Sequence, residues 1–359
     1  MIASVKNLDL KNYKRTIVLS DIHGDYEGFI NVLNEIHFSN DDYLIIVGDI
    51  LEKGKNSLKL LRKVMNMNNC TLVLGNNDTL FSDWKSGFVQ PSDMIWYMNS
   101  REHSIFLEMA NELNLEYQTE EDLKILEEQV FKTYPNEINF LNNCPYIVDT
   151  EDYIFVHAGI DPNKELNEQD TDTCISAPAF SNTKYKFEKI VIVGHWPASN
   201  YSKEKINVNS YYNNSNNILS IDGGNSMKSW QQINYLIIEN NVIKYQSYDR
   251  CEKIKCLEKQ DESKDPISLI FPNTYIEIKE KYELNSLCYI PYIDRELMID
   301  NKRIYEYKRK TYCSDFTTYH LGVHENEIVS YCRQEDDGIL IKKDGIVGLY
   351  KGRYEKGED

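Results

Sequence analysis

The chain has 359 residues, of which 27 % are charged and 41 % hydrophobic, and these values are typical of a globular protein with room for more than one domain. Its formal net charge of −17 argues against a broad nucleic-acid surface, because such surfaces need clustered Lys and Arg. No uncharged stretch approaches the roughly 20 residues that span a bilayer, and the N-terminal segment has no apolar run of the secretory type. We therefore expect a cytoplasmic protein with no nucleic-acid and no membrane partner.

The first 245 residues alternate short β-branched runs with segments of helical periodicity, which predicts a sheet covered by helices. We expect Asp25 to start the first helix and Ser57 to cap the second. Two alternating runs joined by Asn-Asn predict a hairpin within 235–248. Buried strands are expected at 15–20, 43–48, 70–75, 153–158, 189–194 and 217–224.

Changes in composition predict the domain organisation, in which residues 1–250 form the main domain. Residues 79–146 are rich in Glu, Asn, Leu and Met, and we expect a helical insertion there that lies over one edge of the sheet. Residues 251–266 are charged and end at a proline, as a linker does. Residues 267–359 alternate apolar and polar side chains between Asp-Gly turns, which predicts a small all-β module and resembles bacterial SH3-like barrels. Two further segments, 160–188 and 197–216, are expected to be polar loops.

Five short strings of polar residues and glycine each follow an apolar, strand-like run. The strings are SDIHG (20–24), GDILEKG (48–54), GNND (75–78), FVHAG (155–159) and VGHW (193–196). The carboxyl ends of neighbouring parallel strands meet at one edge of a sheet, and oxygen ligands together with imidazole suit divalent metals. The pattern therefore predicts a two-metal site, in which a shared carboxylate keeps the ions about 3.5 to 4 Å apart. The candidate ligands are Asp21, His23, Asp49, Asn76, His157 and His195.

Each candidate ligand taken alone has a simpler explanation, since an Asp after a strand is usually a turn residue. Six such residues, five of them beside a Gly or Ala that lets the backbone approach closely, are hard to explain by turn chemistry alone. The eight cysteines are scattered without a CxxC pair, and we expect them to be reduced and structural, Cys251 and Cys256 included.

On these five strings, and over roughly residues 15–245, the chain resembles the calcineurin-like metallophosphoesterases. Within them it is similar to the branch of serine/threonine phosphoprotein phosphatases and symmetrical diadenosine-tetraphosphate hydrolases. The resemblance implies a four-layer α/β/β/α sandwich with two divalent ions, which are manganese, iron or zinc. It also implies that Asp49 bridges the ions, and that the remaining ligands are Asp21 and His23 for the first ion and Asn76, His157 and His195 for the second.

Three residues depart from the family pattern. Asn77 stands where the family has the histidine of GNHE, and Glu52 and Lys53 replace the Asp and Arg of DRG. An amide cannot act as a general acid, and loss of such a group typically costs about 10²- to 10⁴-fold in rate. Lysine cannot reproduce the bidentate contact of arginine with phosphate. We expect Lys53 and Asn77 to contact the phosphoryl oxygens. We also expect the loss in hydrolysis rate to be smallest for substrates with good leaving groups.

The predicted activity is metal-dependent phosphoester hydrolysis of the serine/threonine phosphatase type, by in-line attack of a hydroxide held between the ions. A phosphodiesterase or dinucleotide polyphosphate hydrolase is one alternative, and a binding protein that keeps its metals without turnover is another. The expected partners are a phosphorylated protein or a small phosphoester as substrate, and a protein that binds the C-terminal module. The expected catalytic residues are Asp49, Glu52, Lys53 and Asn77, with Lys184, Lys186 and His103 as weaker candidates and Asp222 as a structural carboxylate.

Overall fold

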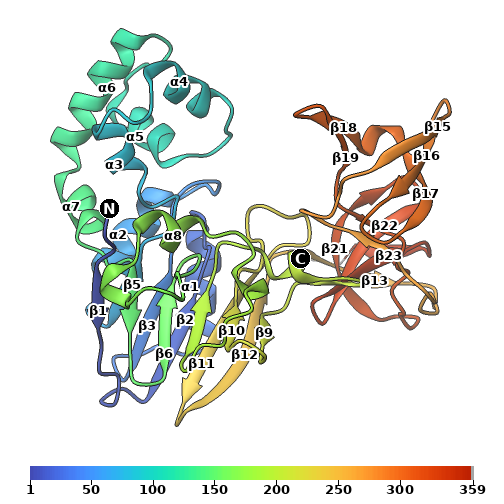
Figure 1. Cartoon of the computed structure of the whole chain (residues 1–359), viewed down its shortest axis with the longest axis horizontal. Helices are drawn as coiled ribbons and strands as arrows, with labels where there is room; N and C mark the ends of the chain where they lie inside the picture. Colours follow the sequence, from blue (N-terminus) through green and yellow to red (C-terminus); the bar gives the residue numbers. More distant parts are fainter. Residues whose placement is uncertain (357–359) are drawn as a thin grey trace. The chain divides into compact units, whose positions relative to one another are not determined.

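The computed structural model describes residues 1–356 and divides the chain into two compact units (Figure 1). The first unit consists of Met1–Pro197 and Ser210–Arg250. The second consists of Ala198–Asn209 and the chain from Cys251 onward. The sequence predicts a first domain that is continuous to residue 250, whereas the segment Ala198–Asn209 in fact belongs to the second unit.

Two β-sheets form the centre of the first unit. The five-stranded sheet has the order β12 (Val242–Asp249), β11 (Gln232–Glu239), β2 (Arg15–Leu19), β3 (Asp42–Val47) and β4 (Cys70–Val73). The six-stranded sheet has the order β1 (Val5–Asn7), β5 (Ile147–Asp149), β6 (Tyr153–Val156), β7 (Ile190–Val193), β10 (Ile218–Ser220) and β9 (Tyr211–Asn213). The predicted hairpin is present as β11 and β12, whose turn places Asn240 and Asn241 at positive φ.

Apolar side chains on both faces of the strands hold the layers together, as the alternation of a pleated strand requires. Val18 and Phe155, from β2 and β6, lie in the cluster between the two sheets. Ile17 and Leu19, which flank Val18, lie instead in the cluster that β2 shares with the helices. A third cluster covers the outer face of the six-stranded sheet and includes Cys174. These clusters confirm the predicted four-layer α/β/β/α sandwich.

Two helices follow the first two motif strands, α1 (Tyr26–Glu35) and α2 (Ser57–Met65). Asp25 caps α1 as predicted, because its carboxylate accepts a 2.9 Å hydrogen bond from the amide of Gly28. The N-cap of α2 is Asn56 and not the predicted Ser57. The hydroxyl of Ser57 accepts a hydrogen bond from the backbone N–H of Glu52 instead, at 3.0 Å.

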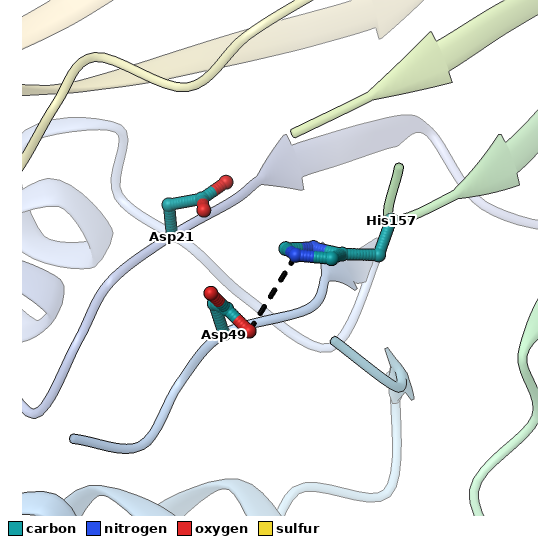
Figure 2. A group of neighbouring side chains, drawn as sticks. All are labelled: Asp21, Asp49 and His157. Carbon is teal, nitrogen blue, oxygen red and sulfur yellow. Dashed lines mark ion pairs between the residues drawn. The ribbon is translucent and has the colours of Figure 1, made fainter. Parts of the chain in front are cut away.

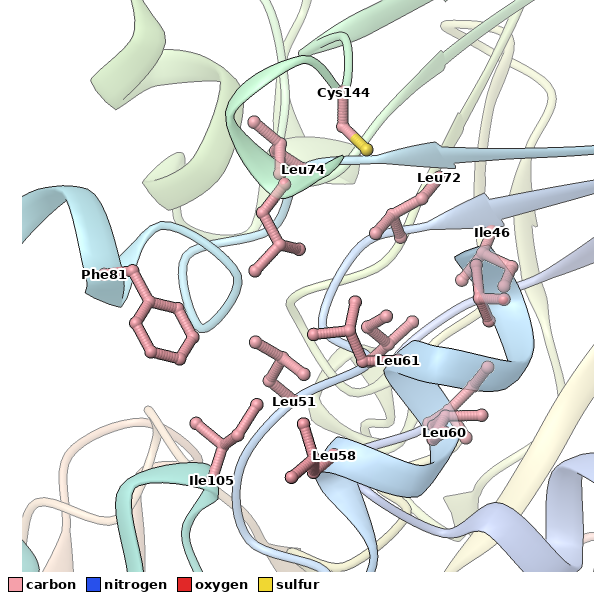
Figure 3. Close-up of a cluster of buried hydrophobic side chains, with 14 of the residues drawn as sticks. Ile46, Leu51, Leu58, Leu60, Leu61, Leu72, Leu74, Phe81, Ile105 and Cys144 are labelled. Atoms are coloured by element: carbon pink, nitrogen blue, oxygen red, sulfur yellow. The ribbon is translucent and has the colours of Figure 1, made fainter. Parts of the chain in front are cut away.

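The chain between β4 and β5 forms a group of helices where the sequence predicts a helical insertion. Two aromatic rings at its base, those of Phe81 and Phe106, have centroids 4.9 Å apart. Figure 3 shows how Phe81 and Ile105 of the insertion lie near Leu51 and Leu58 of the first unit's core. The helices are α3 (Leu80–Lys85), α4 (Pro91–Asn99), α5 (Ile105–Leu113), α6 (Glu120–Thr133) and α7 (Pro135–Asn142).

The segment 160–188, predicted to be a polar loop, contains short helices because its apolar residues cover the six-stranded sheet. Cys174 and Phe180 are buried there. The elements are η1 (Leu166–Glu168), α8 (Thr171–Ser176) and η2 (Phe180–Asn182).

The second unit is all β, apart from the short helices η3 (Ala198–Tyr201) and η4 (Asn301–Arg303). Its largest sheet has the order β24 (Tyr354–Lys356), β13 (Glu252–Cys256), β21 (Ile328–Glu335), β22 (Gly338–Lys343), β23 (Ile346–Tyr350) and β8 (Ile206–Asn207). Smaller sheets are formed by β14 (Ser268–Leu269) with β20 (Phe316–Thr317), by β15 (Glu277–Lys281), β16 (Asn285–Ile290) and β17 (Arg295–Asp300), and by β18 (Ile304–Tyr307) with β19 (Lys310–Cys313).

The predicted all-β character of the C-terminal region is confirmed, and the SH3-like resemblance stays a prediction. The predicted linker, 251–266, contains β13, which pairs with β21 and with β24. Ile254 and Cys256 are buried in the core of this sheet, and Lys255, which lies between them, alternates to the opposite face of the strand. Likewise, the predicted loop 197–216 contains β8 and β9.

Two further expectations can be compared with the described chain. The eight cysteines, all within residues 1–356, are thiols in the structure, and their reduced state in the cell stays a prediction. Within residues 1–356, no helix combines the length and hydrophobicity that a membrane span requires.

The packing of the two sheets leads to a prediction about stability. Phe155 is fully buried between the sheets, and its replacement by alanine should lower the free energy of unfolding of the first unit by about 4 kcal/mol, because it leaves a cavity. Phe88 is 83 % exposed, and the matched Phe88→Ala variant should change the free energy of unfolding by less than about 0.5 kcal/mol. Urea denaturation measures both values, and equal effects would contradict the assigned packing.

Candidate metal centre

The polar strings of the sequence form loops at the carboxyl ends of strands, and their backbone is unusual. Six of the site residues have positive φ, a region that residues other than glycine rarely adopt. Such conformations cost about 1 to 3 kcal/mol each and persist only where the surrounding structure enforces them. The residues and their φ angles are Asp21 (50°), His23 (50°), Asp49 (56°), Glu52 (68°), Lys53 (67°) and His195 (63°).

Asp49 lies at the end of β3 and is almost completely buried. Asn77 holds its carboxylate with two donors, the backbone N–H at 2.9 Å from Oδ1 and the side-chain Nδ2 at 2.5 Å from Oδ2. His157 Nε2 lies 3.5 Å from Oδ1 of the same carboxylate. Figure 2 shows Asp21, Asp49 and His157 turned toward one another, and ligand atoms of these three residues lie within 4.8 Å of one another. This group has the composition of a divalent-metal site.

Two histidines are oriented by backbone carbonyls. Nδ1 of His157 is 2.9 Å from the carbonyl oxygen of Val47, and Nδ1 of His23 is 3.2 Å from that of Leu51. A carbonyl only accepts, so Nδ1 carries the proton in both rings and Nε2 of the neutral ring has an available lone pair. This hydrogen bond to the second nitrogen is the usual device that orients a metal-binding histidine.

Asn76 lies between the imidazoles of His157 and His195. Its side-chain Oδ1 is 3.2 Å from Nε2 of His157 and 3.0 Å from Nδ1 of His195. Since Nδ1 of His157 is protonated, its Nε2 and the amide oxygen of Asn76 face each other with lone pairs. A cation satisfies such an arrangement, so these three side chains fit a metal ion.

The electrostatics of the centre also favour a bound cation. Burial, together with the nearby carboxylates of Asp222 and Asp49, raises the pKa of Asp21 well above its usual value. Burial acts in the same direction on Asp49, but neighbouring basic groups, among them Lys53, outweigh it and lower the pKa of Asp49 to about 2. Oδ2 of Asp222 is buried without a hydrogen-bond partner in the described part of the chain. Several buried carboxylates at one place are costly unless positive charge offsets them.

Lys53 is the basic side chain that the structure places at this centre. Its Nζ is 3.1 Å from Nε2 of His23 and 3.1 Å from Sδ of Met227. Of the other candidates, Lys184 and Lys186 are exposed, and Nε2 of His103 is 3.4 Å from a carboxylate oxygen of Glu102 in the insertion.

Glu52, expected to be catalytic, has a different set of partners. Its carboxylate accepts hydrogen bonds from Tyr97 Oη at 2.7 Å, from Ser104 Oγ at 2.9 Å and from the N–H of Ile105 at 3.0 Å. Burial raises the pKa of Glu52, although these donors oppose the shift. All three partners belong to the helical insertion, and these contacts favour an anchoring role for Glu52 over the predicted catalytic one.

Asp78 is a site residue that the sequence reasoning did not single out. Its carboxylate accepts hydrogen bonds from the N–H groups of Asp49, Ile50, Leu51 and Gly75, at 2.7 to 3.3 Å. It thereby joins the loop after β3 to the loop after β4. A signal was present, because Asp78 is the fourth residue of GNND and corresponds to the acidic residue of the family's GNHE.

Residues 14–222 match the sequence profile of the calcineurin-like phosphoesterase family, and the chain belongs to that family. The match confirms the resemblance drawn from the five motif strings. Among curated relatives, the chain is 28 % identical over 187 residues to the symmetrical bis(5'-nucleosyl)-tetraphosphatase of Coxiella burnetii (strain Dugway 5J108-111), covering 50 % of this chain and 55 % of the relative. It is 40 % identical over 65 residues to the enzyme of the same name from Erwinia tasmaniensis, covering 18 % of this chain and 24 % of that relative.

The chain spans about half the length of the Coxiella relatives it matches. Two solved structures illustrate the similarity in three dimensions. A chain provisionally described as a diadenosine tetraphosphatase has a TM-score of 0.47 at 16 % identity, with 69 % of this chain and 99 % of that chain covered. A protein serine/threonine phosphatase from Saccharomyces cerevisiae has a TM-score of 0.39 at 12 % identity, with 70 % and 84 % covered.

The position of Asp78 leads to a second prediction. Asp78→Ala should lower the free energy of unfolding by about 3 kcal/mol, because it removes the acceptor for several buried N–H groups. Asp41 is exposed, and Asp41→Ala is the matched control, with an expected change below about 0.5 kcal/mol. Urea denaturation followed by fluorescence measures both variants. A loss for Asp78→Ala no larger than for the control would show that the carboxylate does not organise the loops.

Proposed function

We propose that this protein is a metal-dependent phosphoester hydrolase with a two-ion centre. The observation that carries the proposal is the buried convergence of carboxylates and imidazole lone pairs around Asp49. Divalent ions bound there would lower the pKa of a coordinated water and offset negative charge on phosphoryl oxygens. The residues proposed to hold the ions are Asp21, His23, Asp49, Asn76, His157 and His195.

The protein's own side chains prepare this centre before a substrate arrives. Asn77 holds the carboxylate of Asp49 with two hydrogen bonds, and so its proposed role is to orient the bridging ligand. The carbonyls of Val47 and Leu51 keep the two imidazoles in the tautomer whose Nε2 is an acceptor, and in His23 this nitrogen lies 3.1 Å from Nζ of Lys53. Lys53 is proposed to supply positive charge to the phosphoryl oxygens, as a point charge on a flexible stem.

Asn77 also bears on the substrate class. An amide cannot protonate a departing alkoxide, so a leaving group that is already stable as an anion suits this centre best. Phosphoanhydrides have such leaving groups, whereas serine and threonine phosphates do not. The curated relatives are symmetrical bis(5'-nucleosyl)-tetraphosphatases. We therefore propose dinucleoside tetraphosphates as the first substrates, each hydrolysed by one water to two nucleoside diphosphates, ahead of phosphoproteins.

This proposal makes a prediction about activity. The full chain with added Mn²⁺ should convert diadenosine tetraphosphate to ADP, and Asp49→Asn should lower kcat at least about 100-fold, because the bridging charge is lost. Chromatographic quantification of ADP measures the rate. Chelation by EDTA should abolish turnover and Mn²⁺ should restore it, while the exposed Asp41→Asn variant should retain full activity.

Two results would contradict the activity. Equal rates for Asp49→Asn and the parent would show that the Asp49 carboxylate is not needed for hydrolysis. Two bound metals by elemental analysis, without turnover on a broad panel of phosphoesters, would instead support a metal-binding protein that lacks catalysis.

The role assigned to Asn77 can be tested by restoring the histidine of the family. Asn77→His should raise the rate of phosphate release from a phosphothreonine peptide, by up to about 100-fold, because an imidazole can protonate the leaving alkoxide. The rate on diadenosine tetraphosphate should change much less. Asn34 is exposed on α1, and Asn34→His is the matched control. No gain on the peptide, with metal content retained, would show that the amide does not limit this reaction.

A further inference from the structure

The second unit carries a local basic segment on a strongly acidic chain. Residues 302–310 contain five basic residues and one acidic residue, although the whole chain has a net charge of −17. Two of the basic residues are neutralised within the unit, because Arg303 binds Glu335 and Lys302 lies 3.6 Å from Asp336. The other three are Lys308, Arg309 and Lys310, at the turn between β18 and β19.

The turn itself is unusual for such side chains. Tyr307 pairs with Lys310, so Lys308 and Arg309 form a two-residue hairpin loop, and both have positive φ, 47° and 62°. Asn and Gly are the residues that favour this geometry, and the hairpin turn between β11 and β12 does use two asparagines. Lys and Arg lack the short polar side chain of Asn, and they adopt positive φ at a cost in stability. Strain of this kind is common at functional sites, and here it places two cations at the tip of the hairpin.

One face of the hairpin is rich in tyrosine. Tyr305 pairs with Tyr312, and their rings are 5.9 Å apart with an interplanar angle of 23°. Tyr275 lies beside them, with its ring centroid 6.0 Å from that of Tyr312. Tyr305 and Tyr307 have exposed fractions of 48 % and 57 %. Figure 1 shows β18 and β19 as a separate two-stranded ribbon within this unit.

The cations lie among these rings. Nζ of Lys308 is 5.2 Å from the ring centroid of Tyr307, and Nζ of Lys310 is 5.8 Å from that of Tyr275. Glu306, the acidic residue of the segment, alternates with Tyr305 and Tyr307 along β18 and so faces the opposite side of the ribbon. The surface defined by Tyr275, Tyr305, Tyr307, Lys308, Arg309, Lys310 and Tyr312 is called the tyrosine-lysine face below.

We propose that the tyrosine-lysine face binds a short segment of single-stranded nucleic acid. Exposed aromatic rings stack on unpaired bases of any sequence, and adjacent Lys and Arg contact the phosphates between them. An acidic peptide would pair with the cations but would leave the exposed rings without flat partners. The expectation of no nucleic-acid partner came from the net charge of the whole chain, whereas a site of two or three nucleotides depends on local charge.

The test is a fluorescence anisotropy titration of the full chain with a fluorescein-labelled oligouridylate dodecamer, in EDTA so that the metal centre cannot act. Lys308→Asn/Arg309→Gly removes two cations and installs the residues that the turn prefers. It should weaken binding at least about 10-fold and lower the salt slope of the binding constant by about 1.4, while the melting temperature stays equal or rises. Tyr305→Ala/Tyr307→Ala should weaken binding about 10- to 100-fold.

The control is Lys244→Asn/Tyr245→Ala on β12, where Tyr245 is 47 % exposed beside a lysine on another hairpin. This variant should bind the oligonucleotide as the parent does. The proposal is overturned if the parent shows no saturable binding at about 50 mM salt, or if the hairpin variants bind unchanged. It is also overturned if a polyglutamate peptide or anionic lipid vesicles bind equally well with the same dependence on both variants. Hydrolysis by the metal centre is measured separately, so failure here leaves the proposed function intact.

Discussion

The burial of the Asp49 carboxylate at the end of β3 is the constraint on which the metal centre depends. A charged group removed from water needs compensating donors or cations. The fold supplies two donors from Asn77 and places His157 at 3.5 Å, while Asp21 adds a second buried carboxylate nearby. The remaining negative charge is what makes the position suitable for divalent ions.

Asp78 and the strands themselves stabilise the loops that carry the candidate ligands. Left-handed backbone at Asp21, His23 and Asp49 would relax in an isolated peptide. It persists because β2, β3 and β4 are parallel and anchor the start of each loop, while Asp78 satisfies amides from two of the loops. The fold thereby fixes the backbone that carries the candidate ligands.

The altered motif GDILEKG connects the centre to the helical insertion. Glu52 binds Tyr97, Ser104 and the amide of Ile105, so the segment between two ligand loops also holds the insertion in place. Leu51, the residue before Glu52, packs in the cluster that contains Ile105 and Leu58 (Figure 3). The departure from the family pattern at Glu52 thus gives the motif three hydrogen bonds with the insertion. Lys53, the next residue, remains beside His23.

Much of the fold and the site was predictable from local sequence, for a physical reason. Buried strands need apolar runs, and ligands at their carboxyl ends must follow those runs directly, so periodicity and spacing located β2, β3, β4, β6 and β7 and the candidate ligands. The Asn-Asn turn was predictable for the same reason, because it depends only on the φ angles of two adjacent residues.

Contacts between segments distant in the chain were not predictable in this way. The partners of Glu52 lie 45 to 53 residues away, and the amides that Asp78 binds include three from the preceding loop, 27 to 29 residues away. The assignment of Ala198–Asn209 and β13 to the second unit also depends on strand pairing over long distances. The sequence by itself therefore determined the layers and the family. Only the tertiary structure decided which side chain each buried carboxylate binds, because a buried charge takes its donors from whatever the fold places beside it.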